Sequence, residues 1–325
     1  MKIFTVPDST TSSFLKPRKE DLIITSCEGE AATRATVWAL ESGQTAVLAI
    51  QNSGLGNAIN PLTSFTSLYR SRISMKIVIG WRGAPGVKDE VQHGVMGAIT
   101  PVLLETLDIA YAVPDTEAEF ADRMEEEVKT GEIKAILVRP GLLSSADDGE
   151  TSVASRKIAL DSDEVFAEIL RHKDMFDRFV LSTGYNGRQF YSHSGMEAAY
   201  LNTDDRSVIY NVGAMGFSYA MGLELHGQGL RTLVVDGDGS ALMHFGSYVK
   251  DEHLRPKCLV LFNGQHESVG GFDLPFQSME TMIAHIPNAV QITGLDELAA
   301  FLRGEGRIGI VPTAPRSNKK LKRPL

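Results

Sequence analysis

Residues 232–240 read TLVVDGDGS, an apolar, β-branched run that ends in glycines and acids. Such a run predicts a buried strand, and the turn after it predicts a loop at the carboxyl end of that strand. Open parallel sheets bind ligands at this end, because the loops there present free backbone groups and helix N-termini. The stretch therefore indicates an α/β fold with a ligand site near Asp238.

Similar short apolar runs lie on both sides of this stretch and alternate with helix-like segments. Strands are predicted at 22–25, 45–51, 73–79, 133–138, 179–182, 207–210, 232–236 and 258–262, and helices at 30–41, 116–129 and 162–173, the last with Ser162 as N-cap. Because the pattern occurs twice, we predict two doubly wound parallel-sheet domains, at 1–145 and 162–325. The turn-rich residues SSADDGETS mark 146–161 as the linker.

The net charge, the number of cysteines and the distribution of apolar residues limit the classes of protein to which the chain could belong. The chain has 325 residues and a net charge of -9, which argues against a nucleic-acid-binding surface. Its two cysteines, Cys27 and Cys258, are too few for a disulfide framework and fit a reducing compartment. The N-terminal residues MKIFTVPDST lack the apolar core of a signal peptide, and no stretch is long and apolar enough to span a membrane. We therefore expect a cytoplasmic protein.

The acidic turn also predicts a metal site. Asn263 follows Gly239 by 24 positions and ends the next apolar run, so a carboxylate and an amide are expected at neighbouring strand ends. Mg²⁺ prefers oxygen ligands and often bridges a protein to phosphates. Asp238, the side chain of Asn263 and the carbonyl of Gln265 are the predicted ligands. The alternative is that Gly-Asp-Gly is simply a tight turn.

Gly-Asp-Gly followed by Asn some two dozen residues later resembles the diphosphate and metal motif of thiamine diphosphate (TPP)-dependent enzymes. The resemblance covers nearly the whole chain and implies TPP and Mg²⁺ as cofactors. It also implies that Glu28, in CEGEAA at 27–32, contacts the pyrimidine ring of TPP. A carboxylate in a dry cleft there would favour the reactive tautomer of the ring. Without the resemblance, Glu28 is more simply a solvated acid at a helix N-terminus.

The same resemblance implies that several glycine-rich loops hold the cofactor. Small residues in such loops let the backbone approach a diphosphate closely. The implied cofactor-binding residues are Ser53, Gly54, Asn57, Gly184, Tyr185, Gly213, Met215, Gly237, Asp238, Gly239, Ser240 and Asn263. For Met215, an ordinary place in the core is the alternative.

Two segments indicate which TPP-dependent enzymes the chain resembles. QNSGLGNAINPL at 51–62 and GWRGAPGVKDEVQH at 80–93 are similar to the matching segments of phosphonopyruvate decarboxylases. A phosphonate needs several hydrogen-bond donors, so Arg82, Lys88 and Gln92 are expected to bind substrate, and His93 is expected to take part in catalysis. The alternative is that these side chains pair with acids of the same surface loop.

The function implied is TPP- and Mg²⁺-dependent decarboxylation of 3-phosphonopyruvate to phosphonoacetaldehyde and CO₂, in phosphonate biosynthesis. His266, in QHESVGG at 265–271, is a candidate proton carrier or, alternatively, a structural hydrogen-bonding group. The resemblance implies at least a homodimer with active sites between subunits. Sulfopyruvate decarboxylation is one rival function. A weakened or non-catalytic TPP-binding relative is another, since the spacing from Asp238 to Asn263 is shorter than the family usually shows.

Overall fold

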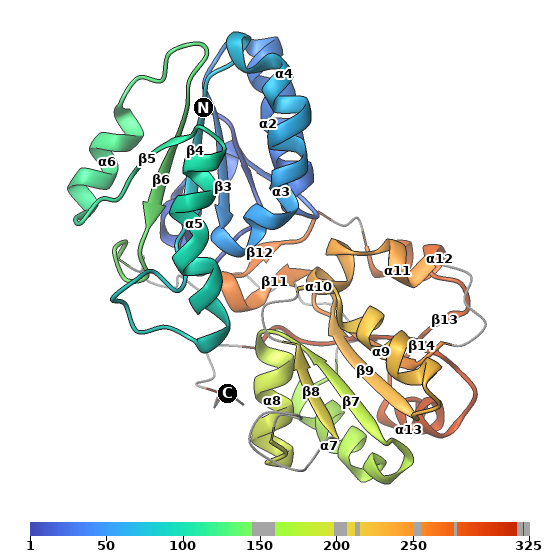
Figure 1. The fold of residues 1–325 in the computed structure, drawn as a ribbon. Coiled ribbons are helices and arrows are strands. Elements are labelled where there is room, and N and C mark those ends of the chain that lie inside the picture. The colour runs from blue at the N-terminus through green and yellow to red at the C-terminus, as the bar shows by residue number, and fades with distance from the viewer. Residues whose placement is uncertain are drawn as a thin grey trace. The chain divides into compact units, whose positions relative to one another are not determined.

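The computed structural model describes residues 1–144, 160–197, 207–211, 215–249, 255–275, 278–316 and 321. The chain divides into two compact units (Figure 1). The first comprises Met1–Thr151 and Val269–Pro275, and the second comprises Ser152–Ser268 and Phe276–Leu325. The predicted linker, 146–161, lies almost wholly outside the described residues.

One segment groups with the unit that precedes it rather than with its neighbours in the chain. Val269–Pro275 was predicted within the second domain but groups with the first unit. The physical reason is Phe272, which is buried in the same hydrophobic core as Phe14 and Phe120.

The described part of the first unit contains a six-stranded parallel sheet in the order β2-β1-β3-β4-β6-β5. Its strands are β1 (Ile3–Thr5), β2 (Leu22–Ile24), β3 (Ala46–Gln51), β4 (Met75–Gly80), β5 (Ala110–Ala112) and β6 (Ile133–Val138). Successive side chains enter two different cores: in β4, Ile77 and Ile79 face one and Val78 faces the other. Burial on both faces explains why most residues of β3, β4 and β6 are apolar.

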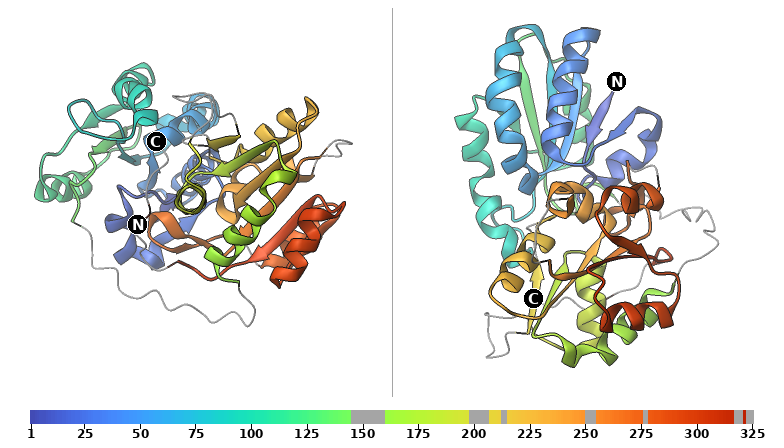
Figure 2. Two further views of the ribbon diagram at one scale, coloured as in Figure 1. Left: turned by 90° about the horizontal axis from the view of Figure 1, so that it is seen from below. Right: turned by 90° about the vertical axis from the view of Figure 1, so that its right-hand side faces the viewer.

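Helices cover both faces of this sheet (Figure 2). Residues of α2 (Glu28–Ser42), α3 (Leu55–Pro61) and α5 (Gly94–Thr106) complete one core. Residues of α1 (Ser12–Leu15) and α6 (Glu117–Glu125) complete the other. The short helix α4 (Ser67–Tyr69) and the two-residue strand β12 (Phe272–Asp273) also belong to this unit.

The second unit has the same type of architecture as the first. The described part of its sheet is parallel and six-stranded, in the order β13-β14-β10-β9-β7-β8. These strands are β7 (Arg178–Ser182), β8 (Val208–Asn211), β9 (Thr232–Gly237), β10 (Lys257–Phe262), β13 (Ala289–Gln291) and β14 (Ile308–Pro312), and β11 (Gln265–His266) follows β10.

Two cores again lie on opposite faces of the sheet. One includes residues of α7 (Ser162–Arg171), α8 (Tyr185–Ser194) and α13 (Leu295–Arg303). The other includes residues of α9 (Ser218–Gly227), α10 (Asp238–Met243), α11 (Gly246–Val249) and α12 (Met279–His285). The predicted class, two doubly wound parallel-sheet domains, is therefore confirmed. Among the helices of the described residues, none has the length and apolar character needed to cross a bilayer.

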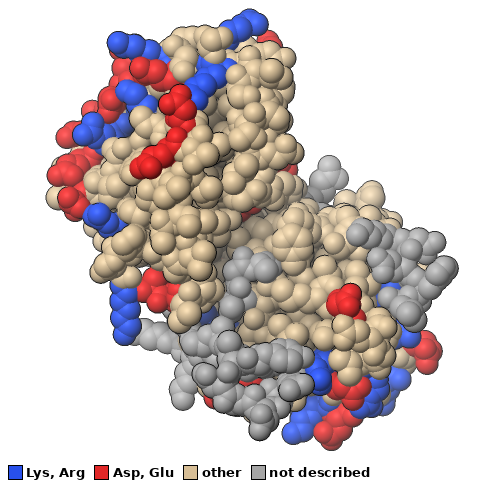
Figure 3. All heavy atoms as spheres, viewed as in Figure 1, with Lys and Arg blue, Asp and Glu red and all other residues tan. Residues whose placement is uncertain are grey.

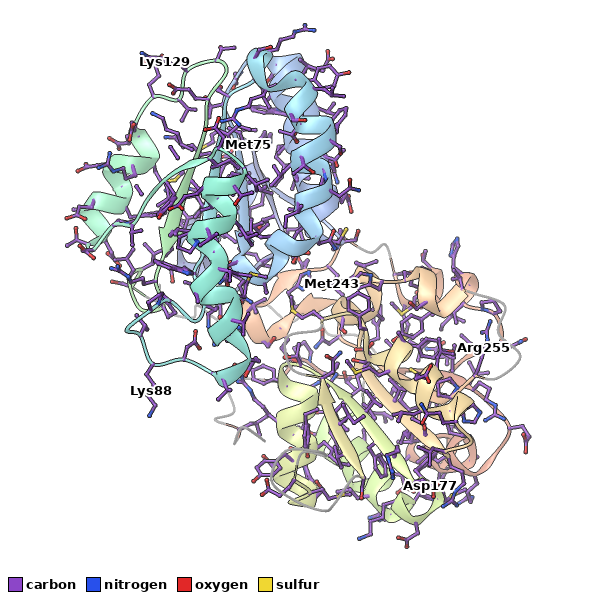
Figure 4. All side chains as sticks on the ribbon, viewed as in Figure 1. Met75, Lys88, Lys129, Asp177, Met243 and Arg255 are labelled. Carbon is purple, nitrogen blue, oxygen red and sulfur yellow. The ribbon has the colours of Figure 1, made fainter. Side chains whose placement is uncertain are left out.

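All eight predicted strands are present, with ends that differ by at most two residues. Two details of the helices were wrong. The N-cap of α7 is Asp161, whose side chain accepts a hydrogen bond from the N–H of Asp163, so Ser162 is already inside the helix. Helix α6 ends at Glu125 because Glu126 has a non-helical backbone, with φ -52° and ψ 130°, which leaves Lys129 in the following loop (Figure 4).

Candidate functional site

Glu28 begins α2 and is buried in the first unit. Burial raises the pKa of its carboxyl group. Gly54 lies directly against it, since a Cβ on Gly54 would be 2.4 Å from Cγ and 2.6 Å from Oε1 of Glu28. The N–H of Gly29 donates to Oδ1 of Asn57 at 3.1 Å. The structure thus brings together three predicted site residues, Glu28, Gly54 and Asn57.

The loop that carries Gly54 is joined to the loop after β4. Ser53 accepts a hydrogen bond from Nε2 of Gln51 at 2.6 Å. Asn52 is buried, and its amide donates to the carbonyl of Arg82 at 2.8 Å and accepts from the N–H of Arg82 at 3.2 Å. Nδ2 of Asn52 also donates to Oγ1 of Thr100 at 3.0 Å. Asn52, which the sequence did not single out, therefore fixes the position of the predicted substrate loop.

Arg82 is engaged within its own loop. Its Nε donates to Oδ2 of Asp89 at 2.8 Å and its Nη2 to Oδ1 at 2.5 Å, with Oε2 of Glu90 at 3.5 Å. Burial alone would raise the pKa of Asp89, but hydrogen bonds from Arg82, from the N–H of Gly83 and from the N–H of Glu90 hold it well below its usual range. For Arg82 the structure shows the internal pairing that was the alternative to substrate binding.

The other three predicted residues of this loop differ in their surroundings. Gln92 donates to Oε2 of Glu90 at 2.7 Å. His93 is buried, with Nε2 at 3.5 Å from the same oxygen, and burial, aided by Arg82, lowers its pKa. Lys88 is exposed and its side chain points away from the ribbon of the first unit (Figure 4). The side chain of Lys88 is thus the one most open to an added anion.

Asp8 is a buried carboxylate that the sequence did not reveal as a site residue. It accepts hydrogen bonds from the N–H groups of Thr10 at 2.7 Å and Thr11 at 3.2 Å, and from Oγ1 of Thr11 at 2.5 Å. Burial raises its pKa despite these bonds and the nearby charge of Arg82. Its position follows from the end of β1, in VPDS at 6–9, and only the tertiary structure places it against Gly80.

In the second unit, Asp238 begins α10 directly after β9 and is buried. Its carboxylate accepts from the N–H groups of Gly239 at 2.8 Å, Asn263 at 2.8 Å and Gly264 at 2.6 Å. Strand β10 runs parallel to β9 in the sheet, so the residue that follows β10 reaches the residue that follows β9. The predicted neighbours Asp238 and Asn263 therefore lie together.

Further contacts order the side chain of Asn263. Its Oδ1 accepts from the N–H of Gln265 at 2.9 Å, and its Nδ2 donates to Oε2 of Glu267 at 2.9 Å. Each of these amide and carboxylate oxygens has further lone pairs, which suits a hard cation. In the described part of the chain, no three His, Cys, Asp or Glu side chains gather as a metal site. A cation at Asp238 would consequently depend on amide and carbonyl oxygens.

The remaining predicted cofactor residues of this unit, apart from Gly213, lie in the described part of the chain. Gly184 precedes α8 with a φ of 83°, a left-handed backbone that favours glycine, and a Cβ there would lie 3.0 Å from Oγ of Ser268. Ser240 accepts from the N–H of Gly216 at 3.1 Å. Met215 is half-buried, and Gly213 lies outside the described residues. A Cβ on Gly237 would lie 3.3 Å from Nδ2 of Asn186.

His266 is placed close to this cluster in sequence, and its imidazole is neutral. Burial lowers its pKa to about 4. Within the described residues, its Nε2 is buried and has no hydrogen-bond partner. At neutral pH a histidine with this pKa is largely in the uncharged form, which is a poor general acid, so a role as acid would require the pKa to rise when other groups bind.

Arg316 is a second residue that the sequence did not reveal. It follows β14 and only 5% of its side chain is exposed. Its Nη2 donates to Oδ1 of Asn186 at 2.8 Å, its Nε lies 3.4 Å from Oε2 of Glu267, and its guanidinium lies 5.8 Å from the centre of the Tyr185 ring. No local motif marked this arginine, because its importance comes from the loops that surround it.

Comparison with known proteins identifies two enzymes of the same name as relatives of this chain. No protein-family model matches the chain. Phosphonopyruvate decarboxylase of Streptomyces viridochromogenes is 36% identical over 274 residues, which cover 75% of this chain and 64% of that protein. The enzyme of the same name from Streptomyces hygroscopicus is 35% identical over 271 residues, 75% of this chain and 63% of that protein. The resemblance to phosphonopyruvate decarboxylases is confirmed. The chain spans slightly less than two thirds of the length of these curated relatives.

A shorter match involves a second kind of enzyme. The alpha subunit of sulfopyruvate decarboxylase from Methanothermobacter thermautotrophicus is 35% identical over 101 residues, 30% of this chain and 59% of that subunit. Among solved structures, the TPP-dependent 4-hydroxybenzoylformate decarboxylase of Rhodococcus jostii RHA1 covers 98% of this chain and 97% of its own, with 11% identity and a TM-score of 0.40. Of the sequence relatives described, the two phosphonopyruvate decarboxylases cover the larger share of this chain, 75% against 30%.

Proposed function

We propose that this protein decarboxylates 3-phosphonopyruvate to phosphonoacetaldehyde and CO₂, with TPP and Mg²⁺ as cofactors, in phosphonate biosynthesis. The observation that carries the proposal is the buried Glu28, packed against Gly54 beside Asn57, in a chain that is 36% identical to a phosphonopyruvate decarboxylase. Burial raises the pKa of a carboxyl group toward neutral pH, so that the group can serve as a proton donor or acceptor. Such a group is what the pyrimidine ring of TPP would need as its partner.

The residues present suit both cofactors. Asp238, Asn263 and the carbonyl of Gln265 would hold Mg²⁺, and the backbone around Gly184 and Gly237 would face the diphosphate. When bound, the thiazolium ring of TPP supplies the electron sink for decarboxylation. The protein itself would orient the 2-oxo acid and stabilise its charge.

For the substrate phosphonate, Lys88 is the most available cation of the loop at 80–93. Arg82 is already paired with Asp89. Unless that ion pair breaks, Arg82 would support substrate binding only by stabilising the conformation of the loop. Gln92 and His93 share contacts with Glu90 and could be reoriented by an incoming anion. We therefore assign direct substrate binding first to Lys88 and only then to Arg82 and Gln92.

A homodimer with active sites between subunits forms part of the proposal. The exposed side of α5 and the turn before it carries apolar side chains, with Val91 92%, Val95 76%, Val102 57% and Ile99 39% exposed. In Figure 3 the surface along the middle of α5 shows no charged side chain. We name the surface formed by these four residues the α5 face. An apolar surface without charges is typical of a subunit interface.

We also propose that the protein works in the cytoplasm. Cys27 and Cys258 are free thiols, and Cys258 is buried in the second unit. A reducing compartment suits both.

The decisive experiment measures CO₂ release from 3-phosphonopyruvate and from sulfopyruvate by the purified protein with TPP and Mg²⁺. We expect turnover of phosphonopyruvate and a loss of about 100-fold or more in Glu28→Gln. Glu41→Gln is the control, because Glu41 lies on the same helix but is exposed. Preferred turnover of sulfopyruvate would favour the second candidate, which the match to the sulfopyruvate decarboxylase subunit supports. TPP binding without turnover of either acid would indicate a non-catalytic relative.

A further inference from the structure

Arg316 reaches the carboxyl ends of the strands in the second unit. The N–H of Thr313 donates to the carbonyl of Phe262 at 2.9 Å, so the chain after β14 runs along the end of β10. Three residues later the guanidinium lies among side chains of two predicted cofactor loops, Tyr185 with Asn186 and Asn263 with Glu267. Loops at this edge of a parallel sheet are where ligands bind.

The guanidinium is buried but incompletely satisfied. Among the described residues, the guanidinium forms one hydrogen bond, from Nη2 to Oδ1 of Asn186. Within the described residues, Nε and Nη1 are buried without a hydrogen-bond partner, although Nε lies 3.4 Å from a carboxylate oxygen of Glu267. Arginine presents its donors in a rigid planar fork that matches phosphate oxygens. A buried fork with unused donors is therefore an incomplete anion site.

We propose that the guanidinium of Arg316 donates hydrogen bonds to the diphosphate of the bound cofactor, an inference that rests on the cofactor assignment made above. Arg316 is then a binding residue supplied by the segment after the last strand. It adds a positive charge to a site otherwise made of backbone N–H groups and oxygen ligands. Its contact with Asn186 fixes the orientation of the fork before the ligand arrives.

The surrounding charges determine what the site can accept. Glu267 and Asp238 both act on Arg316 electrostatically, so carboxylates outnumber the guanidinium. An anion alone would be repelled by this excess of negative charge. A diphosphate should therefore bind together with a divalent cation and only weakly without one.

The test uses isothermal titration calorimetry on the full chain with two ligands, inorganic pyrophosphate and TPP, each with and without Mg²⁺. Arg316→Gln should raise the Kd of both ligands at least tenfold in the presence of Mg²⁺. Arg316→Lys keeps the charge but loses the fork, so it should raise both Kd values by a smaller factor. Arg307→Gln, at an exposed arginine of the same unit, should leave both unchanged.

The outcomes separate this inference from the proposed function. If the wild-type protein binds pyrophosphate but not TPP, the proposed function fails, and Arg316 is judged by pyrophosphate alone. Unchanged or tighter binding in Arg316→Gln would overturn the inference, because the guanidinium would then be structural or a competitor of the anion. Failure of the wild-type protein to bind either ligand would overturn it as well. Should Arg316→Gln not fold, Arg316→Lys decides by the same criterion.

Discussion

At the scale of single residues, Gly54 shows why a small side chain matters at the site. Its Cα faces Glu28 so closely that any Cβ would overlap the acid. Gly54→Ala must therefore displace the carboxylate, and we expect CO₂ release and TPP affinity to fall at least tenfold. Gly56→Ala is the control, since a Cβ there meets nothing within 4 Å. Equal activity of the two variants would show that the position of Glu28 is unimportant.

His266 gives a prediction about pH. Its pKa of about 4 in the folded protein lies below the ordinary value of 6.5, so the unfolded chain binds a proton first as the pH falls. The free energy of unfolding should therefore decrease between pH 6.5 and pH 4, by at most about 3 kcal/mol from this group. His266→Asn should remove that part of the decrease in urea titrations at several pH values. His285→Asn, at an exposed histidine, should leave the pH profile as it is.

Single residues also show what the sequence could not reveal. Glu28, Asp238 and Asn263 stood in recognisable local motifs, and the structure brings each beside other residues that the motifs named. Asp8 and Arg316 lie in no such motif. Their role comes from burial against loops that are distant in the chain, 74 positions for Asp8 and Arg82 and 130 for Asn186 and Arg316. Short-range patterns carry no information of that kind.

At the scale of elements, the loop between β4 and α5 is held by one carboxylate. Asp89 accepts from Arg82 twice, from the N–H of Gly83 and from its neighbour Glu90. The pair is largely buried, with 15% of Arg82 and 9% of Asp89 exposed. Asp89→Asn should cost about 2 to 4 kcal/mol in urea unfolding, because it leaves the largely buried Arg82 with only the longer contact to Glu90 as an ion pair.

The matched control for this substitution is in the second unit. Asp177, labelled in Figure 4, also binds an arginine, Arg231, through two side-chain hydrogen bonds and one from its backbone N–H. This pair is at the surface, with 35% of the Asp177 side chain and 60% of the Arg231 side chain exposed. Asp177→Asn should cost less than about 1 kcal/mol. Similar losses for both variants would mean that the loop is not stabilised by burial of its ion pair.

The elements themselves were predictable where the apolar runs were long. Strands such as β6 and β10 contribute side chains to cores on both faces of their sheets, so their residues are apolar apart from Lys134 and Lys257. The short strands β1 and β5 and the late strands β13 and β14 were missed. They are three to five residues long, and only pairing with a longer neighbour defines them as strands.

At the scale of the whole molecule, the α5 face tests the proposed dimer. Val95→Asp places a charge in the middle of this surface and should convert a dimer to a monomer in sedimentation velocity, because a buried unpaired charge is costly. Val290→Asp is the control, since Val290 is 43% exposed on β13 of the second unit. A wild-type protein that sediments as a monomer would remove the basis for active sites between subunits.

Because Val269–Pro275 belongs to the first unit but follows Ser152–Ser268 in the chain, the first unit is completed only late in translation. The ribosome releases residues 1–151 long before it releases Phe272, and Ser152–Ser268 must be translated in between. At ordinary rates of elongation this takes on the order of ten seconds. During that time the core around Phe14 and Phe120 lacks one of its aromatic side chains, so the nascent first unit exposes an apolar surface to chaperones until translation supplies the segment that covers it.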